Sequence, residues 1–444
     1  MSNVAPPVAP IGAHPLLVLL LQLGVLLATA LLLGRLAVRL TLPAVVGELC
    51  SGLLLGPSVL GQVAPGPSGW LFPHDVEQVH LLDAVGQLGV LLLVGIAGMH
   101  IDLPLIRRKG VAAATVSAGG LLVPFGLGLG AGFLLPASLL AVGGDRVVFA
   151  LFLGVALCVS AIPVIAKTLL EMRLLHRDVG QLIMSAAVVD DVAGWLMLSV
   201  VSALATSGVR GGQVLLSVLC LLGLVGFAVV LGRPVTRTVL RLAYRSGADS
   251  LTIGSATVLL VLGAAGTQAL GLEAILGAFG VGILIASSGE AYVRRLAPLR
   301  TFAVGVLAPV FFATSGLRMD LTALARPDVL AGAVLIVSIA ILGKFAGAYA
   351  GARASRLGHW EALALGAGLN ARGVIEVVIA LVGLRLGVLS TAMYTIVVLV
   401  AIVTSLMAPP TLRCAVARIA VTTERDVEAA VGGHPPGRRA RPSR

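Results

Sequence analysis

Long apolar stretches separated by short polar segments recur along almost the whole chain. Most of them are close to the ~20 residues that a helix needs to cross the hydrocarbon core of a bilayer. Apolar residues follow one another without a polar alternation, which favours helices over the strands of a membrane barrel. Of the 444 residues, 58% are hydrophobic and 11% are charged, whereas soluble domains carry about 25% charged residues. We therefore expect an all-α integral membrane protein.

The stretches predict about 13 transmembrane helices. Their expected bounds are 16–34, 42–61, 79–98, 110–135, 147–168, 180–206, 212–232, 251–270, 273–288, 301–317, 329–351, 360–384 and 389–411. The N-terminal segment 1–15 has no lysine or arginine, so the first stretch is expected to remain as a span and not to be cleaved as a signal peptide. The tail 412–444 is polar and basic, and we expect it to be disordered.

The basic residues between the spans indicate the orientation. Seventeen lysines and arginines follow odd-numbered spans, and five follow even-numbered ones. Basic loops stay in the cytoplasm, which predicts an extracytoplasmic N-terminus and a cytoplasmic tail in the cell membrane. The net charge of +11 thus belongs to the loops and not to a nucleic-acid-binding surface. The four cysteines show neither metal-ligand spacing nor a disulfide framework.

Two adjacent aspartates, Asp190 and Asp191, lie in the middle of the apolar stretch 184–201. An ionisable residue inside a membrane span is by default a functional-site hypothesis, and two like charges side by side resist joint ionisation. Neighbouring helix positions point about 100° apart, so one aspartate can face a partner helix while the other faces a cavity. The alternative, a solvated loop, would require a turn signal in this run. The pair therefore needs a compensating cation, either from the protein or as cargo.

Two basic residues, Lys344 and Arg372, lie inside predicted spans. A lone ammonium in lipid is costly, so we expect Lys344 to form an ion pair with an aspartate. Snorkelling to the interface is the alternative, but it requires a position near a helix end. Arg372 and Glu376 are four residues apart and could pair on one helix face, for structure or for function.

Two predicted spans contain interruptions. In the fifth, Pro163 cannot donate to the carbonyl of Val159, so that carbonyl and the Ser160 hydroxyl are potential cation ligands; an ordinary proline kink is the alternative. In the twelfth, the segment 366–373 combines three glycines with Asn370. If the seventh span is a linker, the two interrupted spans occupy matching places in two halves. This arrangement indicates a secondary transporter with inverted repeats and a midplane site.

The segment 160–198, SAIPVIAKTLLEMRLLHRDVGQLIMSAAVVDDVAGWLML, resembles the fifth and sixth spans of the monovalent cation:proton antiporter superfamily, in its second branch. The segments VVGELCSGLLLGPSVLG and GLNARGVIEVVIALVGL are similar to the second and twelfth spans of that branch. The resemblance is to plant and fungal cation/proton exchangers, to Kef-type proteins and to bacterial sodium/proton antiporters. It extends over spans two to thirteen.

The resemblance implies a sodium/proton antiporter-like fold with two inverted repeats and crossed broken helices. It also implies a homodimer. In that fold the helices of about 16–98 and 251–317 form the scaffold and dimer interface, and those of about 110–206 and 329–411 form a mobile core. The transmembrane domain as a whole spans 16–411.

For the site, the resemblance implies that Asp191 is the main carboxylate for the proton and for the transported metal cation. Asp190 would pair with Lys344, and Ser160 would lie beside them at the helix crossing. The double-aspartate arrangement is associated with electrogenic exchange. Kef-type channels usually carry Gln-Asp where this chain carries Asp-Asp, which disfavours a gated efflux channel.

The expected function is exchange of Na+ or K+ for protons by alternating access, in a role such as pH homeostasis, with no cofactor apart from the transported ions. Two alternatives remain at this point: a gated K+ efflux channel of Kef type, and a Na+-coupled symporter of organic solutes. An enzyme is not expected, because the sequence has no nucleophile–base motif, metal cluster or phosphate loop. Glu48 is a further acid in the second span, and either contacts the transport path or only caps a helix contact.

Overall fold

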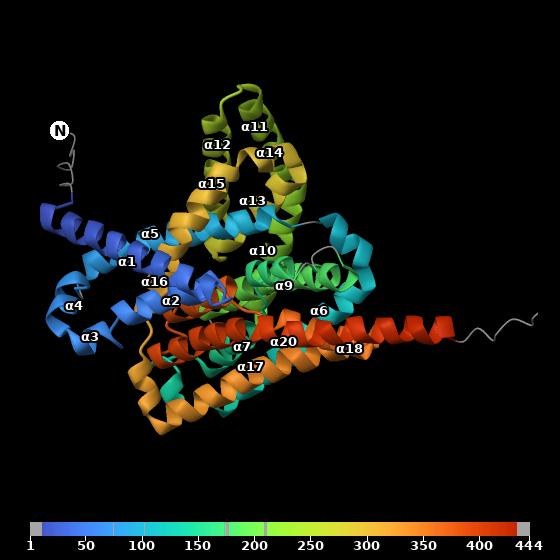
Figure 1. Cartoon of the computed structure of the whole chain (residues 1–444). Helices are drawn as coiled ribbons and strands as arrows, with labels where there is room; N and C mark the ends of the chain where they lie inside the picture. Colours follow the sequence, from blue (N-terminus) through green and yellow to red (C-terminus); the bar gives the residue numbers. More distant parts are fainter. Residues whose placement is uncertain are drawn as a thin grey trace, which may run out of the picture.

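The structure is a computed structural model that describes residues 11–73, 75–101, 103–172, 174, 177–207 and 211–432. Helices form the fold of these residues, and the β-structure within them is one isolated bridge between Leu140 and Leu389. Figure 1 shows the chain from its N-terminal end to the last long helix.

The first half of the chain forms helices up to the linker between the two halves. They are α1 (Ala13–Arg39), α2 (Ala44–Leu55), α3 (Leu60–Val63), α4 (Pro65–Leu71), α5 (Val76–Met99), α6 (Leu103–Leu134), the 3-10 turn η1 (Ala137–Leu139), α7 (Arg146–Cys158), α8 (Ile162–Glu171), α9 (Asp178–Ser207) and α10 (Gly211–Phe227).

The second half continues with a π-helical turn and further helices. They are η2 (Ala228–Gly232), α11 (Arg233–Arg245), α12 (Asp249–Ala269), α13 (Ala274–Ser288), α14 (Glu290–Arg295), α15 (Ala297–Phe302), the π-helical η3 (Ala303–Leu307), α16 (Ala308–Leu317), the 3-10 turn η4 (Leu321–Ala325), α17 (Pro327–Ala354), α18 (His359–Leu369), α19 (Val374–Arg385) and α20 (Thr391–Gly432).

Ten helices of the described chain are long and apolar enough to cross a membrane. An eleventh span is formed if α18 and α19, which are bent by 45° at their break, count as one. The two remaining predicted spans, 147–168 and 273–288, fall on shorter apolar helices. There α7 has 13 residues, because a break ends it at Cys158, and α13 has 15 residues. By length and composition, the described residues therefore form 10 or 11 candidate spans, where the sequence predicted 13.

Two long helical segments extend beyond the predicted spans. The seventh was expected to end at residue 232, but the apolar helix continues from Leu219 to Arg245. The last helix, α20, continues to Gly432, so residues 412–432, expected to be disordered, are helical. Between Pro410 and Gly432 this segment contains no glycine or proline and five alanines, which favours helix. Residues 433–444, and residues 1–10 of the expected N-terminal segment, lie outside the described chain.

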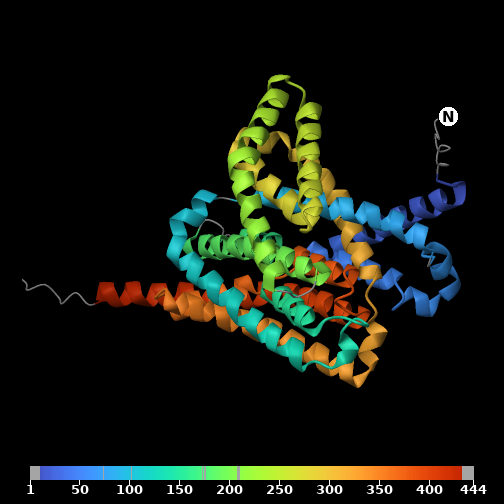
Figure 2. The same cartoon turned by 180° about the vertical axis from the view of Figure 1, so that it is seen from behind.

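The helices pack in two groups. In one, α6 contacts α7, α9 and α17, and α20 contacts α18 and α19. In the other, α2 contacts α1 and α16, while α13 contacts α5 and α12. Figure 1 shows α17, α18 and α20 at the lower edge and the α11–α12 hairpin at the top. Seen from behind in Figure 2, α6 runs along α17.

Glycines allow the closest helix approaches. On α6, a Cβ added at Gly119 would lie 2.2 Å from the carbonyl oxygen of Gly347 on α17, and the reverse contact is also 2.2 Å. Within a bilayer, small residues at an interface let backbones approach and maximise van der Waals contact. The Gly119–Gly347 contact thereby holds α17, and with it Lys344, against α6.

Candidate ion-binding site

Two helix breaks meet in the interior of the α6–α9 and α17–α20 group. The first separates α7 from α8 at residues 159–161, and the second separates α18 from α19 at residues 370–373. Pro163 lies in the first turn of α8, where backbone N–H groups have no intrahelical acceptor, so the missing N–H of proline costs no hydrogen bond. The surroundings of its side chain lie outside the described part of the structure. The N–H of Ala161 donates to the carbonyl oxygen of Ala371 over 2.9 Å. The two breaks are therefore joined through the backbone.

The C-terminal carbonyls of α7 are satisfied by two buried cations. The guanidinium of Arg372 donates to Ala156 over 2.9 Å and to Leu157 over 2.5 Å. The ammonium of Lys344 donates to the carbonyl of Cys158 over 2.5 Å. A helix C-terminus leaves four carbonyls without intrahelical partners and carries partial negative charge, so positive groups stabilise it. This explains how a helix can end at membrane depth.

Asp190 on α9 is fully buried and has three side-chain donors. Its carboxylate accepts from Ser117 over 2.5 Å, from Ser160 over 2.8 Å and from Lys344 over 2.5 Å. The predicted partner Lys344 is thus in contact with Asp190, and Ser160 lies beside the pair. Ser117 on α6 was not predicted, because serines in membrane helices commonly bond to their own backbone and its sequence neighbours carry no signal.

Asp191 has a different environment from its neighbour. It is 2% exposed, and its Oδ1 atom has no hydrogen-bond partner among the described residues. None of the ion pairs found in the described chain involves it. The other buried charges of this group form pairs: Lys344 with Asp190 at 2.5 Å, and Arg372 with Glu376 at 3.3 Å. Lys344 and Arg372 are each paired with another acid, so Asp191 has no basic partner among the described residues.

The second break provides further polar atoms close to the first. The hydroxyl of Ser160 lies 2.8 Å from the carbonyl oxygen of Leu369 as well as from Asp190, and its single proton serves one of them at a time. The Asn370 amide donates to the carbonyl of Ile341 over 3.1 Å, while its oxygen has no partner in the described chain. The Ser405 hydroxyl donates to the carbonyl of Arg372. The crossing thus offers carbonyl, amide and carboxylate oxygens, the ligands that hard cations prefer.

Comparison with known proteins identifies the fold and the family. Residues 25–418 match the family described as sodium/hydrogen exchanger, transmembrane. The chain belongs to the sodium/hydrogen exchanger family. This places it among membrane transporters and not among enzymes.

Three curated proteins similar to this exchanger illustrate the range of the family. It is 32% identical to the Na(+)/H(+) antiporter NhaS4 of Synechocystis over 405 residues, which cover 89% of the chain and 97% of the relative. It is 32% identical to cation/H(+) antiporter 20 of Arabidopsis thaliana, covering 90% of the chain and 48% of the relative. It is 27% identical to K(+)/H(+) antiporter 1 of Saccharomyces cerevisiae, covering 83% and 43%. The exchanger thus spans about half the length of the plant and yeast relatives.

A solved structure shows the same fold. The sodium proton antiporter MjNhaP1 of Methanocaldococcus jannaschii superposes with a TM-score of 0.69 at 17% identity, covering 90% of this exchanger and 99% of that chain. At this identity the likeness concerns the arrangement of helices alone.

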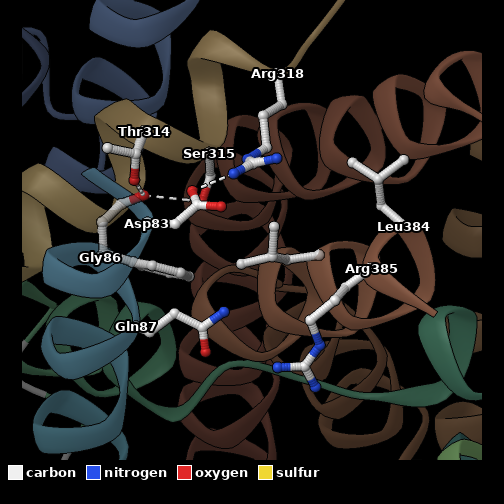
Figure 3. Close-up of a pocket in the computed structure, with 10 residues that line it drawn as sticks. Asp83, Gly86, Gln87, Thr314, Ser315, Arg318, Leu384 and Arg385 are labelled. Carbon is white, nitrogen blue, oxygen red and sulfur yellow. Dashed lines mark hydrogen bonds and ion pairs between the residues drawn. The ribbon is translucent and has the colours of Figure 1, made fainter. Parts of the chain in front are cut away.

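A cavity of about 160 Å³ lies between the two helix groups of the exchanger, apart from the aspartates. Its lining comes from α5, the end of α16 and the end of α19 (Figure 3). Arg318 forms an ion pair with Asp83 on one wall, and Arg385 at the end of α19 reaches Glu273, the residue before α13, over 2.9 Å. The latter pair connects one helix group to the other. Arg318 and Arg385 are two of the five basic residues that follow even-numbered predicted spans, and their sequence positions gave no sign of these pairs.

The remaining predicted residue, Glu48, lies on α2 at the contact with α1. A Cβ added at Gly34 of α1 would lie 3.5 Å from the Glu48 Cγ atom. Its hydrogen-bonded neighbour on the same helix is Ser51, whose hydroxyl donates to the Glu48 carbonyl over 2.6 Å. The structure thus places Glu48 at a helix–helix contact.

Proposed function

We propose that this exchanger moves a monovalent cation, Na+ or K+, across the cell membrane in exchange for protons. The observation that carries the proposal is the difference between two adjacent acids. Asp190 has a protein cation beside it, whereas Asp191 is buried without one. A buried carboxylate must be neutralised, so Asp191 requires either a proton or a cargo cation.

Alternate occupancy of Asp191 couples the two ions. With a proton bound, the carboxyl group is neutral and provides no charge for a metal ion. With a metal ion bound, the positive charge of that ion neutralises the ionised carboxylate. An empty, ionised carboxylate is costly to carry through the barrier, so the core crosses only when it is loaded with one or the other. The crossing of the two breaks provides oxygen atoms close to the adjacent acid, since Ser160 lies 2.8 Å from the carboxylate of Asp190.

The proposed topology counts α7 with α8, and α13, as membrane crossings, which makes 13. The N-terminus then faces outward and the tail faces the cytoplasm of a cell membrane. Three elements before the linker, α6, α7–α8 and α9, correspond to α17, α18–α19 and α20 after it. Two inverted repeats follow from this correspondence, supported by the backbone bond between their breaks.

We further propose that the group containing α6–α9 and α17–α20 is the mobile core, while the other group is a scaffold that pairs in a homodimer. The Glu273–Arg385 ion pair would then link the core to the scaffold on the extracytoplasmic side. We also propose electrogenic exchange, with two protons per cation, because Lys344 and Asp190 form a second site where a proton can be gained or lost.

The test uses the purified exchanger in proteoliposomes with a pH-sensitive dye inside. Addition of Na+ or K+ outside should move internal pH with the membrane voltage short-circuited, a result that a K+ channel does not produce. Asp191→Asn should abolish this response, whereas Asp328→Asn, at an exposed carboxylate on α17, should retain it. A native response in Asp191→Asn would remove the assignment. A response that requires an organic solute would instead indicate a symporter.

The electrogenic proposal has its own measurement. With two protons per cation, the exchange rate should rise or fall as the membrane potential is clamped at different values with valinomycin and K+, while Na+ is the transported ion. A rate that does not change with voltage would indicate one proton per cation.

A further inference from the structure

The helix that carries Asp191 also carries a stripe of polar side chains on the same face. After Asp191 come Trp195, Ser199 and Ser202 at intervals of four, four and three residues. At about 100° per residue these four positions fall within an arc of about 80°, and at about 1.5 Å per residue they extend about 16 Å along the helix axis. This inference rests on the topology proposed above. In that topology, the stripe leads from Asp191 toward the extracytoplasmic end of α9.

The polar atoms of the stripe are buried and unpaired. Trp195 is 2% exposed, Ser199 is fully buried and Ser202 is 3% exposed. Of seven buried side-chain polar atoms that lack a partner among the described residues, four belong to this stripe: Asp191 Oδ1, Trp195 Nε1, Ser199 Oγ and Ser202 Oγ. Buried polar groups in proteins are almost always paired with protein or ordered water, so four in a row point to a common partner.

Two other hydroxyls on α9 are satisfied by their own helix. Ser185 donates to the carbonyl of Gln181 over 2.8 Å, and Thr206 donates to that of Ala203 over 3.0 Å. Bonding to a carbonyl of the preceding turn is thus open to hydroxyls on α9, and in the structure the hydroxyls of Ser199 and Ser202 do not use it.

The stripe faces the boundary between the two helix groups. The ring centroid of Trp195 lies 5.9 Å from that of Phe279 on α13. Ile275 and Leu276 on α13 belong to the same buried cluster as Phe279. Ile275, Leu276 and Phe279 are apolar, so these three side chains of α13 have no hydrogen-bonding group to offer the stripe.

We propose that the stripe holds a single file of water molecules that delivers protons to Asp191 from the extracytoplasmic side. Serine hydroxyls both donate and accept, so they can hydrogen-bond successive waters. The indole N–H only donates, so it fixes the water next to Asp191 with its hydrogens directed at the carboxylate. In the delivery step, an O–H bond of a hydronium ion breaks, a new O–H bond forms on Asp191, and neutral water remains.

The same chemistry excludes the metal cation from this file. A dehydrated Na+ or K+ needs several oxygen ligands, and the stripe offers two hydroxyls and one N–H donor that repels it. Proton and cation therefore reach one carboxylate by different routes.

The first test measures water contact directly. Radiolytic hydroxyl-radical labelling in H₂¹⁸O, read by mass spectrometry, oxidises side chains that touch water. Trp195 should be labelled at a rate within tenfold of exposed Trp70, whereas Tyr394 and Phe149, which are equally buried, should remain unlabelled. Ser199→Val, which fills the file with methyl groups, should reduce Trp195 labelling at least fivefold. Labelling of Trp195 no faster than that of Phe149 would overturn the proposal.

The second test measures transport with a matched pair of variants. Ser199→Ala and Ser185→Ala each remove one buried hydroxyl from α9. Ser199→Ala should lower turnover at saturating cation at least fivefold with the cation KM unchanged, whereas Ser185→Ala should stay within twofold of the native exchanger. Equal turnover in the two variants would overturn the water file while leaving the proposed function intact, since Asp191→Asn tests that function separately. A native chain without any exchange would overturn both.

Discussion

The ammonium of Lys344 lies 2.5 Å from the carboxylate of Asp190 and 2.5 Å from the carbonyl oxygen of Cys158. One buried cation thereby neutralises an acid on α9 and ends the helix α7. Both partners are fully buried, so neither can turn to water when the other is removed. Their pairing links the position of α17 to that of the helix that carries Asp191.

Removal of this ammonium should be strongly destabilising. Breaking a buried ion pair from one side costs about 3–5 kcal/mol, because the remaining charge is buried alone. We expect Lys344→Met to lower the melting temperature in detergent clearly, and the double variant Asp190→Leu with Lys344→Met to recover a large part of the loss. Arg326→Ala, which breaks an exposed pair with Asp328, is the control and should have little effect. Melting curves that coincide for Lys344→Met and the native chain would contradict the pair.

The α6–α17 contact should be intolerant of a single methyl group. In Gly119→Ala, the new Cβ would meet the Gly347 carbonyl oxygen at 2.2 Å, and overpacking of this kind costs about 1–3 kcal/mol. Gly126→Ala on the same helix is the matched control, because nothing lies within 4 Å of its added Cβ. We expect a lower melting temperature for Gly119→Ala and an unchanged or higher one for Gly126→Ala. The reverse order would mean that the helices are farther apart than described.

Competition between proton and cation at Asp191 predicts a specific pH dependence. As the pH falls, protons occupy the carboxylate and exclude the cation, so the apparent KM for the cation should rise, by up to tenfold per pH unit for one competing proton. The maximal rate at saturating cation should change less over the same range. Initial rates across a matrix of cation concentration and pH would show this, and a constant KM with a falling maximal rate would argue for separate sites.

The pair between Glu273 and Arg385 allows a test of relative movement. If the core moves against the scaffold, tethering Glu273→Cys to Arg385→Cys with a flexible, reducible bis-methanethiosulfonate reagent should stop exchange. A reducing agent should restore the exchange. Each single cysteine variant treated in the same way is the control and should retain activity. Undiminished exchange by the tethered exchanger would mean that these two helix ends do not separate during transport.

The sequence analysis identified the parts of the site that stand out against an apolar background. Asp190, Asp191 and Lys344 were conspicuous because charge in a membrane span is rare, and the break near Pro163 was conspicuous because proline lacks an N–H. The capping of α7 by Arg372 could not be predicted, because it depends on how two distant breaks cross. The role of Ser117 was equally hidden.

The helix ends were the weakest predictions. The α20 extension to Gly432 was missed because a polar composition was taken as disorder, although its alanine-rich sequence favours helix. The short helices α7 and α13 made span counting ambiguous, since an apolar stretch in the sequence does not reveal where a helix breaks inside it. The stripe at Trp195, Ser199 and Ser202 became visible only when the structure showed that no protein atom among the described residues satisfies it.

The bond from the Ala161 N–H to the Ala371 carbonyl joins the two broken helices without using a side chain. Ordinary substitutions at either alanine leave both bonding atoms in place, and only proline at 161 would delete the donor. The bond that joins α7–α8 to α18–α19 therefore does not depend on side-chain chemistry at 161 or 371, although both alanines are buried and leave little room for a larger side chain.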